Sequence, residues 1–218
     1  MFDDGNDRMT ATPDLTLYHG PNSRSVRARW MLEAMGLPYT IAPVSFNTRP
    51  VGDTAYGEIH PLRKVPVLKD GDGLVRDSIA IIQYLLGRYG PSELEVKADE
   101  ADYGRYLEFL QFGEAGMLMP VNLLVAHTAL LPENQRNPSL AKWARIEADK
   151  LLAYIANSGL AEGREYLAAD RFTAADISVG YTLYLLKIIR QYDKSHDTLN
   201  AYFDRITARE DWTRASAS

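Results

Sequence analysis

The sequence contains no cysteine. This absence excludes disulfide scaffolds, thiolate zinc sites, iron–sulfur clusters and cysteine nucleophiles. Long apolar runs are also missing, because the longest ones, 121–126 and 183–186, are far too short to span a bilayer. Residues 1–14 carry no apolar stretch typical of a secretory signal. We therefore expect a disordered N-terminal tail and a cytoplasmic protein that does not bind membranes.

Positive charge is scarce as well. The 218 residues include 24 Lys and Arg against 29 Asp and Glu, which gives a net charge of −5. Nucleic-acid binders depend on Lys and Arg to neutralise phosphates, so we expect no nucleic-acid partner. The 4 histidines show no metal-ligand spacing, and no nucleophile elbow, phosphate loop or dinucleotide fingerprint is present. We expect no metal site.

The first part of the chain mixes strand and helix signals. Apolar and β-forming segments predict strands at 15–18, 38–44, 65–68 and 74–76. Helices are expected from Asn22 or Ser23 to Gly36 and from Asp77 or Ser78 to Tyr89, because side chains that cap helix N-termini precede apolar periodicity. The stretch 46–60 is predicted to be mostly loop with one irregular helix. This order indicates an α/β layer with a mixed sheet.

Everything after residue 99 has helical periodicity, over 101–126, 139–157, 174–192 and 199–209. We therefore expect an α/β domain at 15–91, a linker at 92–99 and an all-helical domain at 100–218. Within the latter, Thr173 and Asp176 have the spacing of a capping box.

Five stretches in register resemble the glutathione transferase family. Leu17–Trp30 resembles its first strand, catalytic loop and first helix, with an S-R-x-x-R loop typical of a bacterial and fungal subgroup. The others are the cis-proline segment His60–Leu68, the helix start Arg76–Ile81, the fourth helix Tyr106–Pro120 and the capping box of the sixth helix at Phe172–Ser178.

The resemblance implies a thioredoxin-like N-terminal domain, a helical C-terminal domain and a homodimer. It also implies that glutathione is the co-substrate and that its thiolate is conjugated to a small hydrophobic electrophile, as in detoxification. Two alternatives stay open. One is another glutathione-dependent reaction on the same site: ether cleavage, dehalogenation, isomerisation or peroxide reduction. The other is a glutathione-binding protein without catalysis.

A set of residues is expected to hold glutathione. A cis bond between Val65 and Pro66 would leave the peptide groups of Val65 free to pair with an extended peptide. Asp77 and Ser78 form a helix N-terminus that favours a carboxylate ligand, and the resemblance implies that they hold the γ-glutamyl end. The remaining expected contacts are Lys64 and His60 near the glycyl carboxylate, and Asn22 and Ser25 beside the thiol.

Two hydroxyls compete to stabilise the thiolate. A free thiol has a pKa of about 8.5, and a hydroxyl donor beside a helix N-terminus would lower it. Ser23 begins the S-R-x-x-R loop at the mouth of the first helix. Tyr18 ends the first strand, where tyrosine-type transferases keep their phenol. The neighbours Asn22 and Ser25, or a backbone N–H, are further alternatives.

The electrophile is expected between the two domains, against the first long helix. Residues expected there are Tyr106, Phe109, Gly113 and Met117, although such helical spacing is typical of a packed core. Gly113 and Gly116 would leave room inside the helix, and methionine adapts to varied apolar shapes.

Overall fold

The computed structural model describes residues 13–45, 54–192 and 196–217. Residues 1–12 of the expected tail and 46–53 of the expected loop lie outside this part. The first elements in chain order are β1 Leu15–His19, α1 Ser25–Met35, β2 Thr40–Pro43, α2 Thr54–Ile59, β3 Val67–Asp70, β4 Gly73–Arg76 and α3 Ser78–Tyr89. This order of strands and helices agrees with the one predicted from the sequence.

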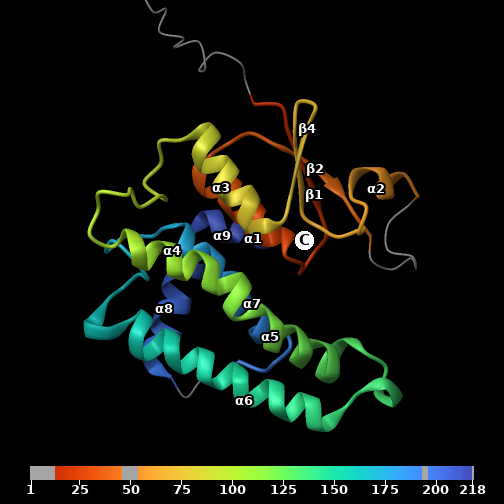
Figure 1. Ribbon diagram of the computed structural model, residues 1–218, viewed down its shortest axis with the longest axis vertical. Coiled ribbons are helices and arrows are strands. Elements are labelled where there is room, and N and C mark those ends of the chain that lie inside the picture. Colours follow the sequence, from red (N-terminus) through yellow and green to blue (C-terminus); the bar gives the residue numbers. More distant parts are fainter. Residues whose placement is uncertain (1–12, 46–53, 193–195, 218) are drawn as a thin grey trace, which may run out of the picture.

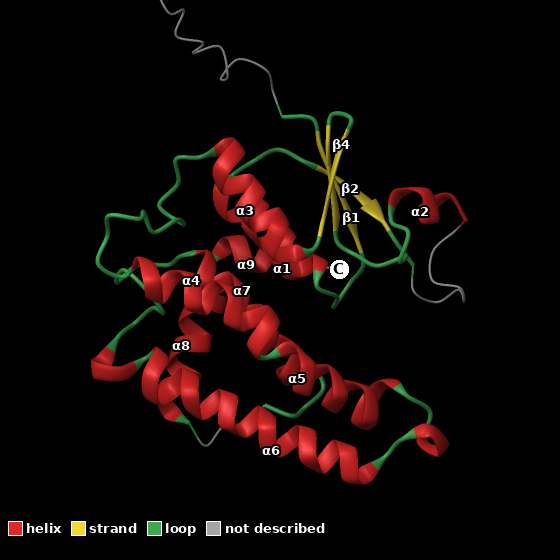
Figure 2. Ribbon diagram, viewed as in Figure 1, coloured by secondary structure: helices red, strands yellow, loops and turns green. Residues whose placement is uncertain are grey.

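The strands form one mixed sheet in the order β2-β1-β3-β4. β1 is parallel to β2 and antiparallel to β3, and β3 is antiparallel to β4. Asp70 pairs with Gly73 across the tight turn, where Gly71 takes a φ of 55° that favours glycine. α1 and α3 lie on one side of the sheet and α2 on the other, as Figures 1 and 2 show. This is the thioredoxin-like arrangement that the sequence predicted.

The rest of the described chain is helical. Its longer elements are α4 Tyr103–Gln111, α5 Leu118–Val125, α6 Pro138–Tyr154, α7 Ala174–Ile188, α8 Asp197–Thr207 and α9 Glu210–Ser216. Single π-turns follow α4, α5 and α6, at Phe112–Gly116, Ala126–Leu130 and Ile155–Gly159. The first of these turns precedes Pro120, which has no N–H to continue the hydrogen-bond ladder. The expected helix 101–126 is therefore a chain of α and π segments.

The run Tyr103–Leu130 is long and apolar enough, by length and composition, to cross a membrane. This run contains no long uninterrupted apolar stretch, because polar residues are scattered along it. In the structure, 44% of its most apolar window is buried, and its α4 and α5 segments pack against α7 and α6. The run therefore acts as a core helix of the helical part.

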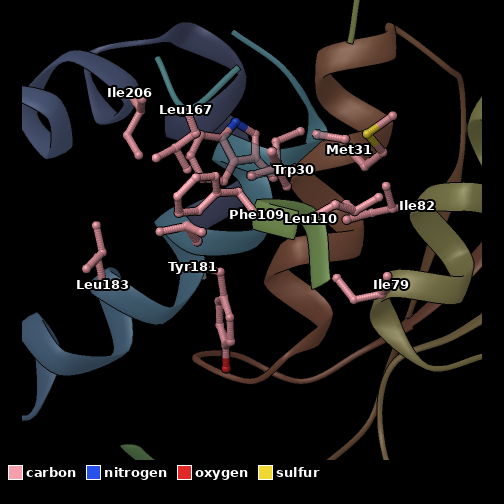
Figure 3. Close-up of a cluster of buried hydrophobic side chains, with 14 of the residues drawn as sticks. Trp30, Met31, Ile79, Ile82, Phe109, Leu110, Leu167, Tyr181, Leu183 and Ile206 are labelled. Atoms are coloured by element: carbon pink, nitrogen blue, oxygen red, sulfur yellow. The ribbon is translucent and has the colours of Figure 1, made fainter. Parts of the chain in front are cut away.

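Trp30 joins the two parts of the molecule. The indole is fully buried and packs at a tilt against the rings of Phe172 and Trp212, with ring centroids 5.6 and 4.6 Å away. Its Nε1 donates a hydrogen bond to Asp211 Oδ1 at 2.9 Å. Figure 3 shows Trp30 on α1 among side chains of the helical part, including Leu167 and Ile206. α9 thus packs directly on α1, although the two helices lie at opposite ends of the sequence.

The capping box at the start of α7 is present. Asp176 is fully buried and its carboxylate accepts hydrogen bonds from Thr173 N at 2.8 Å and Thr173 Oγ1 at 3.1 Å. It also accepts from Leu167 N at 3.0 Å and Tyr202 Oη at 2.9 Å. Burial raises the pKa of Asp176 to about 6, although these hydrogen bonds oppose the shift. The box has a structural role, because it ties α7 to α8.

Candidate functional site

The register of the sheet brings three chain segments together at one edge. Tyr18 pairs with Val67, and Val67 pairs with Arg76. The residues one step beyond these pairs are His19 at the end of β1, Pro66 before β3 and Asp77 after β4. They therefore lie side by side at the same end of the sheet, where α1 and α3 begin. Loops at such strand ends are common binding sites, because the sheet holds them in place.

A cleft of about 350 Å³ opens beside this edge, between the α/β part and the helical part. From the α/β part it is lined by Asn22, Ser23, Arg24, Arg63, Lys64 and Val65. From the helical part it is lined by Asn122, Val125, Tyr181 and Leu185. The lining includes three cationic side chains and no carboxylate among the described residues, and only Arg24 of the three is ion-paired. The cleft therefore favours an anionic ligand.

Val65 presents peptide groups at the wall of the cleft. The Val65–Pro66 peptide bond is cis, as expected. Val65 is buried, yet its N–H and C=O make no hydrogen bond to another described residue. Buried backbone groups are almost always paired, so an unpaired donor and acceptor at a cleft wall are available to a ligand. An extended peptide could pair with both groups, as a further strand would.

Asp77 and Ser78 form the N-terminus of α3. Asp77 Oδ1 caps the helix by accepting from Ile79 N at 2.9 Å and Ala80 N at 3.3 Å. Asp77 is exposed and has a φ of 78°. Ser78 is buried, and its Oγ accepts a hydrogen bond from Arg27 Nη1 at 2.8 Å. The Ser78 hydroxyl hydrogen and backbone N–H have no acceptor among the described residues, so both can donate to a carboxylate.

Ser23 is the hydroxyl that reaches the cleft beside α1. Its Oγ lies 2.6 Å from the carbonyl oxygen of Gly20 and 2.7 Å from Ser25 Oγ. The Ser25 backbone N–H, at the first residue of α1, points to the same Oγ at 3.3 Å. Ser25 itself is fully buried and does not line the cleft. The helix N-terminus and the Ser23 hydroxyl therefore face one volume, where a negative charge would be stabilised.

Tyr18 lies elsewhere. Residues in β1 alternate between the two faces of the sheet, with Leu15, Leu17 and His19 buried. Tyr18 faces the opposite side, where its ring packs 5.7 Å from that of Tyr56 on α2. Tyr18 is not among the residues that line the cleft.

The other expected contacts divide between the cleft and its supports. Lys64 is exposed at the cleft and has no ion-pair partner among the described residues. His60 lies behind it, where its Nδ1 accepts from Leu62 N at 3.0 Å and stabilises the turn. Burial, with Arg76 and Lys64 nearby, lowers the pKa of His60. Asn22 lines the cleft, but its Oδ1 already accepts from Tyr184 Oη at 2.8 Å.

A buried ion pair that sequence reasoning missed supports the site. Arg27 is fully buried and makes five hydrogen bonds, all but one to the π-turn after α4 or to α7. Glu114 accepts from both Arg27 and Arg24. Burial lowers the pKa of Arg27 and Glu114 opposes that shift. One signal for it exists in the sequence, since Arg27 shares the helix face of Met31 and Ala34, at spacings of four and seven residues.

The four residues expected at the electrophile site do not line the cleft. Tyr106, Phe109 and Met117 are buried in the core. Gly113 allows close packing instead of ligand access, because a Cβ there would lie 2.4 Å from Ser178 Oγ on α7. A Cβ at Gly116 would meet the ring of Phe112 at 2.5 Å. The apolar face of α4 therefore belongs to the core.

The cleft wall opposite Ser23 is formed by α5 and α7. Val125 is half-buried, and Leu185 and Tyr181 are nearly buried. Figure 3 shows the Tyr181 hydroxyl pointing away from the core cluster. Burial raises the pKa of Tyr181 to about 12, so its hydroxyl stays protonated. This wall can receive an apolar group, and the Tyr181 hydroxyl can donate a hydrogen bond to a polar substituent of the same ligand.

Comparisons with known proteins identify this arrangement. Residues 13–87 match the model of the glutathione S-transferase N-terminal domain. Glutathione S-transferase 3 of Schizosaccharomyces pombe is 29% identical over 180 residues, which cover 78% of this chain and 73% of the relative. Among solved structures, a glutathione S-transferase from Actinobacillus pleuropneumoniae is 26% identical with a TM-score of 0.74, covering 92% of this chain and 90% of its own.

A glutathione transferase family member from Pseudomonas fluorescens, solved with two glutathione bound, has a TM-score of 0.82 at 22% identity and covers 93% of this chain and 92% of its own. Its fold is shared over nearly all of both chains. The matched N-terminal domain contains Ser23, Val65 and Ser78, and the relatives extend the match through the helical part. Residues 13–87 therefore carry a glutathione S-transferase N-terminal domain, and the chain is similar to glutathione S-transferases over most of its length.

Proposed function

We propose that this protein is a glutathione transferase that binds reduced glutathione in the cleft and conjugates it to a small hydrophobic electrophile. The observation that carries this proposal is that Ser23, at the N-terminus of α1, and the unpaired peptide groups of Val65 line one cleft. The first group would stabilise a thiolate, and the second would fix the cysteinyl residue that bears it.

The remaining groups fit the other parts of glutathione. The γ-glutamyl carboxylate would accept hydrogen bonds from the N–H and hydroxyl of Ser78, and Asp77 would attract the ammonium group. The glycyl carboxylate would lie near Lys64 and Arg63, which have no ion-pair partners among the described residues.

Catalysis would follow from thiolate formation and proximity. At neutral pH only a few per cent of free glutathione carries its thiol as thiolate, because the thiol pKa is about 8.5. A donated hydrogen bond from Ser23 and the positive end of α1 would lower this pKa, and the thiol proton would leave to solvent. An electrophile held against Val125, Tyr181 and Leu185 would then be attacked, with its leaving group or developing negative charge near the Tyr181 hydroxyl.

An ultraviolet difference titration of the protein with glutathione across pH tests this proposal, because the thiolate absorbs and the thiol does not. We expect the thiolate band well below the pKa of the free thiol. Ser23→Ala should raise that pKa while the Kd of glutathione changes only a few-fold, and Tyr18→Phe should leave it unchanged. Saturable binding without the band would mean a glutathione-binding protein without thiol activation.

The chemistry of the second substrate needs a separate experiment. The purified protein should be assayed against aryl halides, activated alkenes, peroxides, aryl ethers and haloalkanes, with glutathione consumption as the common measurement. We expect conjugation of an aryl halide or activated alkene. Turnover of only a peroxide, ether or haloalkane would keep the glutathione site and replace conjugation with another reaction.

A further inference from the structure

Three polar side chains form a line that ends at the cleft. His19, the last residue of β1, has its Nδ1 2.8 Å from Ser25 Oγ. Ser25 Oγ in turn lies 2.7 Å from Ser23 Oγ. His19 and Ser25 are 6% and 0% exposed, whereas Ser23 lines the cleft. The line therefore has two shielded members and one member that can contact a ligand.

Each serine has one hydrogen to donate, and each has at least one acceptor that lies away from the cleft. The closest acceptor to Ser23 Oγ is the carbonyl oxygen of Gly20 at 2.6 Å. Ser25 Oγ accepts from Gly20 N at 3.1 Å and has three possible acceptors: Ser23 Oγ at 2.7 Å, His19 Nδ1 at 2.8 Å and Gly20 O at 3.1 Å. If the neutral imidazole carries its proton on Nε2, the free lone pair of Nδ1 faces Ser25 Oγ and can accept its hydrogen.

We propose that His19 and Ser25 are positioning residues that turn the Ser23 hydroxyl toward a thiolate through a reversal of this hydrogen-bond chain. When Ser23 donates to sulfur, its oxygen can accept from Ser25. Ser25 can then donate to Ser23 only if it no longer donates to His19. The imidazole makes this possible by moving its proton from Nε2 to Nδ1 through solvent, with no change in charge.

In the reversed chain every donor points toward sulfur, from His19 to Ser25 to Ser23. Hydrogen bonds in such a chain polarise one another, so the last donor is strengthened. Burial, with a contribution from Arg29 on α1, lowers the pKa of His19 to about 4. The ring is thus neutral at physiological pH, can exchange tautomers, and is too weak a base to hold the thiol proton.

This inference rests on the proposed function, and the test separates the two. In the unmutated protein, imidazole ¹⁵N shifts report which nitrogen of His19 carries the proton. We expect the Nε2–H tautomer without ligand and the Nδ1–H tautomer with glutathione above the pKa of the bound thiol. S-methylglutathione, which has no ionisable thiol, should leave the Nε2–H tautomer in place. A tautomer that glutathione does not change would overturn the inference.

Variants supply the second measurement. His19→Leu and Ser25→Ala should each raise the pKa of the bound thiol by about half to one unit, the range expected for losing one hydrogen bond. The double variant should shift the pKa no further, because the residues act in series. His19→Asn, whose amide can occupy the Nδ1 position as donor or acceptor, should restore a low pKa. Equal pKa values in all folded variants would contradict the chain.

Different measured results would refute the proposed function and this inference. If unmutated protein binds glutathione without lowering its thiol pKa, the proposed function falls, and so does this inference. If Ser23→Ala raises the pKa but His19→Leu and Ser25→Ala do not, the proposed function stands and the chain is refuted. A purely structural role for His19 would reduce glutathione affinity and stability without moving the thiol pKa, and that outcome also refutes it.

Discussion

Arg27 Nη1 and Ser78 Oγ form a hydrogen bond of 2.8 Å between two side chains that are almost fully shielded from solvent. The same guanidinium bonds to Gly113 O, Ser178 O and Thr182 Oγ1, each at 3.1 Å, in the helical part. The hydroxyl assigned to the γ-glutamyl carboxylate is thus oriented by a residue whose other partners lie in the other part of the molecule.

Arg27→Met should therefore weaken both the fold and the site. The substitution removes the hydrogen bonds of Arg27 to Gly113 O, Ser178 O and Thr182 Oγ1 and one partner of Glu114, and breaking a buried ion pair typically costs about 3–5 kcal/mol. The Kd of glutathione should rise several-fold, because Ser78 loses its orientation. Urea unfolding and calorimetric titration measure the two effects. Arg24→Met is the control, since Arg24 is partly exposed and such pairs contribute less than about 1 kcal/mol. Equal stabilities of the two variants would contradict the prediction.

Gly113→Ala should destabilise the protein by more than a typical substitution, about 3 kcal/mol or more. Its Cβ would lie 2.4–2.5 Å from Ser178, two of the three contacted atoms being backbone, so α7 would have to move. Gly87→Ala is the matched control, because Gly87 lies on the exposed face of α3 and an added Cβ there meets nothing within 4 Å. The control should gain up to about 1 kcal/mol from helix propensity. A melting temperature of Gly113→Ala at or above that of the unmutated protein would rule out the close approach.

His19 should make the free energy of unfolding depend on pH. Its pKa is about 4 in the folded protein and 6.5 as the reference for the unfolded chain. Between these values the unfolded state binds the proton and the folded state does not, so stability is full above pH 6.5 and falls as the pH decreases toward 4. The loss in free energy of unfolding approaches about 3 kcal/mol for a pKa difference of this size.

The comparison of unmutated protein with His19→Asn isolates this effect. Asp176 titrates in both proteins, and its raised folded pKa of about 6 acts in the opposite direction, since stability there falls as the pH rises from 3.8. That contribution cancels in the difference between the two unfolding curves. A difference that stays constant from pH 7 to about 4 would show that His19 is not held neutral by burial.

Val125→Ala should lower kcat/KM for a bulky apolar electrophile by a few-fold to about tenfold, the range for lost methyl groups in an apolar pocket. The Kd of glutathione should not change, because Val125 lies on the opposite wall of the cleft. Leu130→Ala removes a more exposed side chain outside the cleft lining and should leave both constants as they are. If both variants lost activity equally, the electrophile would not contact α5.

Much of the fold could be read from the sequence because its signals are local. The tight turn before Gly73, the cap at Asp77 and the stop of α1 at Gly36 each lie within a few residues of the element they control, and each is present in the structure. The π-turns could not be read in this way. The first of them lies just before Pro120 and packs against α7, and periodicity does not resolve how such features divide one continuous apolar pattern.

The site was only partly predictable, for reasons of the same kind. Ser23, Lys64 and Val65 lie near the strand and helix ends that the sequence places, so they meet at the cleft as expected. The electrophile wall was placed on α4, because periodicity identifies an apolar face but not the neighbour that covers it. α7 packs against α4, and Val125 and Leu185 line the cleft instead, where we propose that the electrophile binds. The partners of Arg27, 51 to 155 residues away, are equally invisible to local patterns.

The contact between α9 and α1 affects the order in which the chain can mature during synthesis. Trp30 and Glu33 on α1 reach their partners Trp212 and Arg214 only after the elements from β2 to α8 have been made. Domains usually fold as units, the N-terminal one first, as the ribosome releases them. Here the N-terminal sheet and its first helix would emerge with the apolar face around Trp30 uncovered until α9 is made. Ribosomes stalled before residue 210 should therefore carry chains that capture a hydrophobic dye and bind glutathione poorly, and chains stalled with α9 outside the ribosome should do neither.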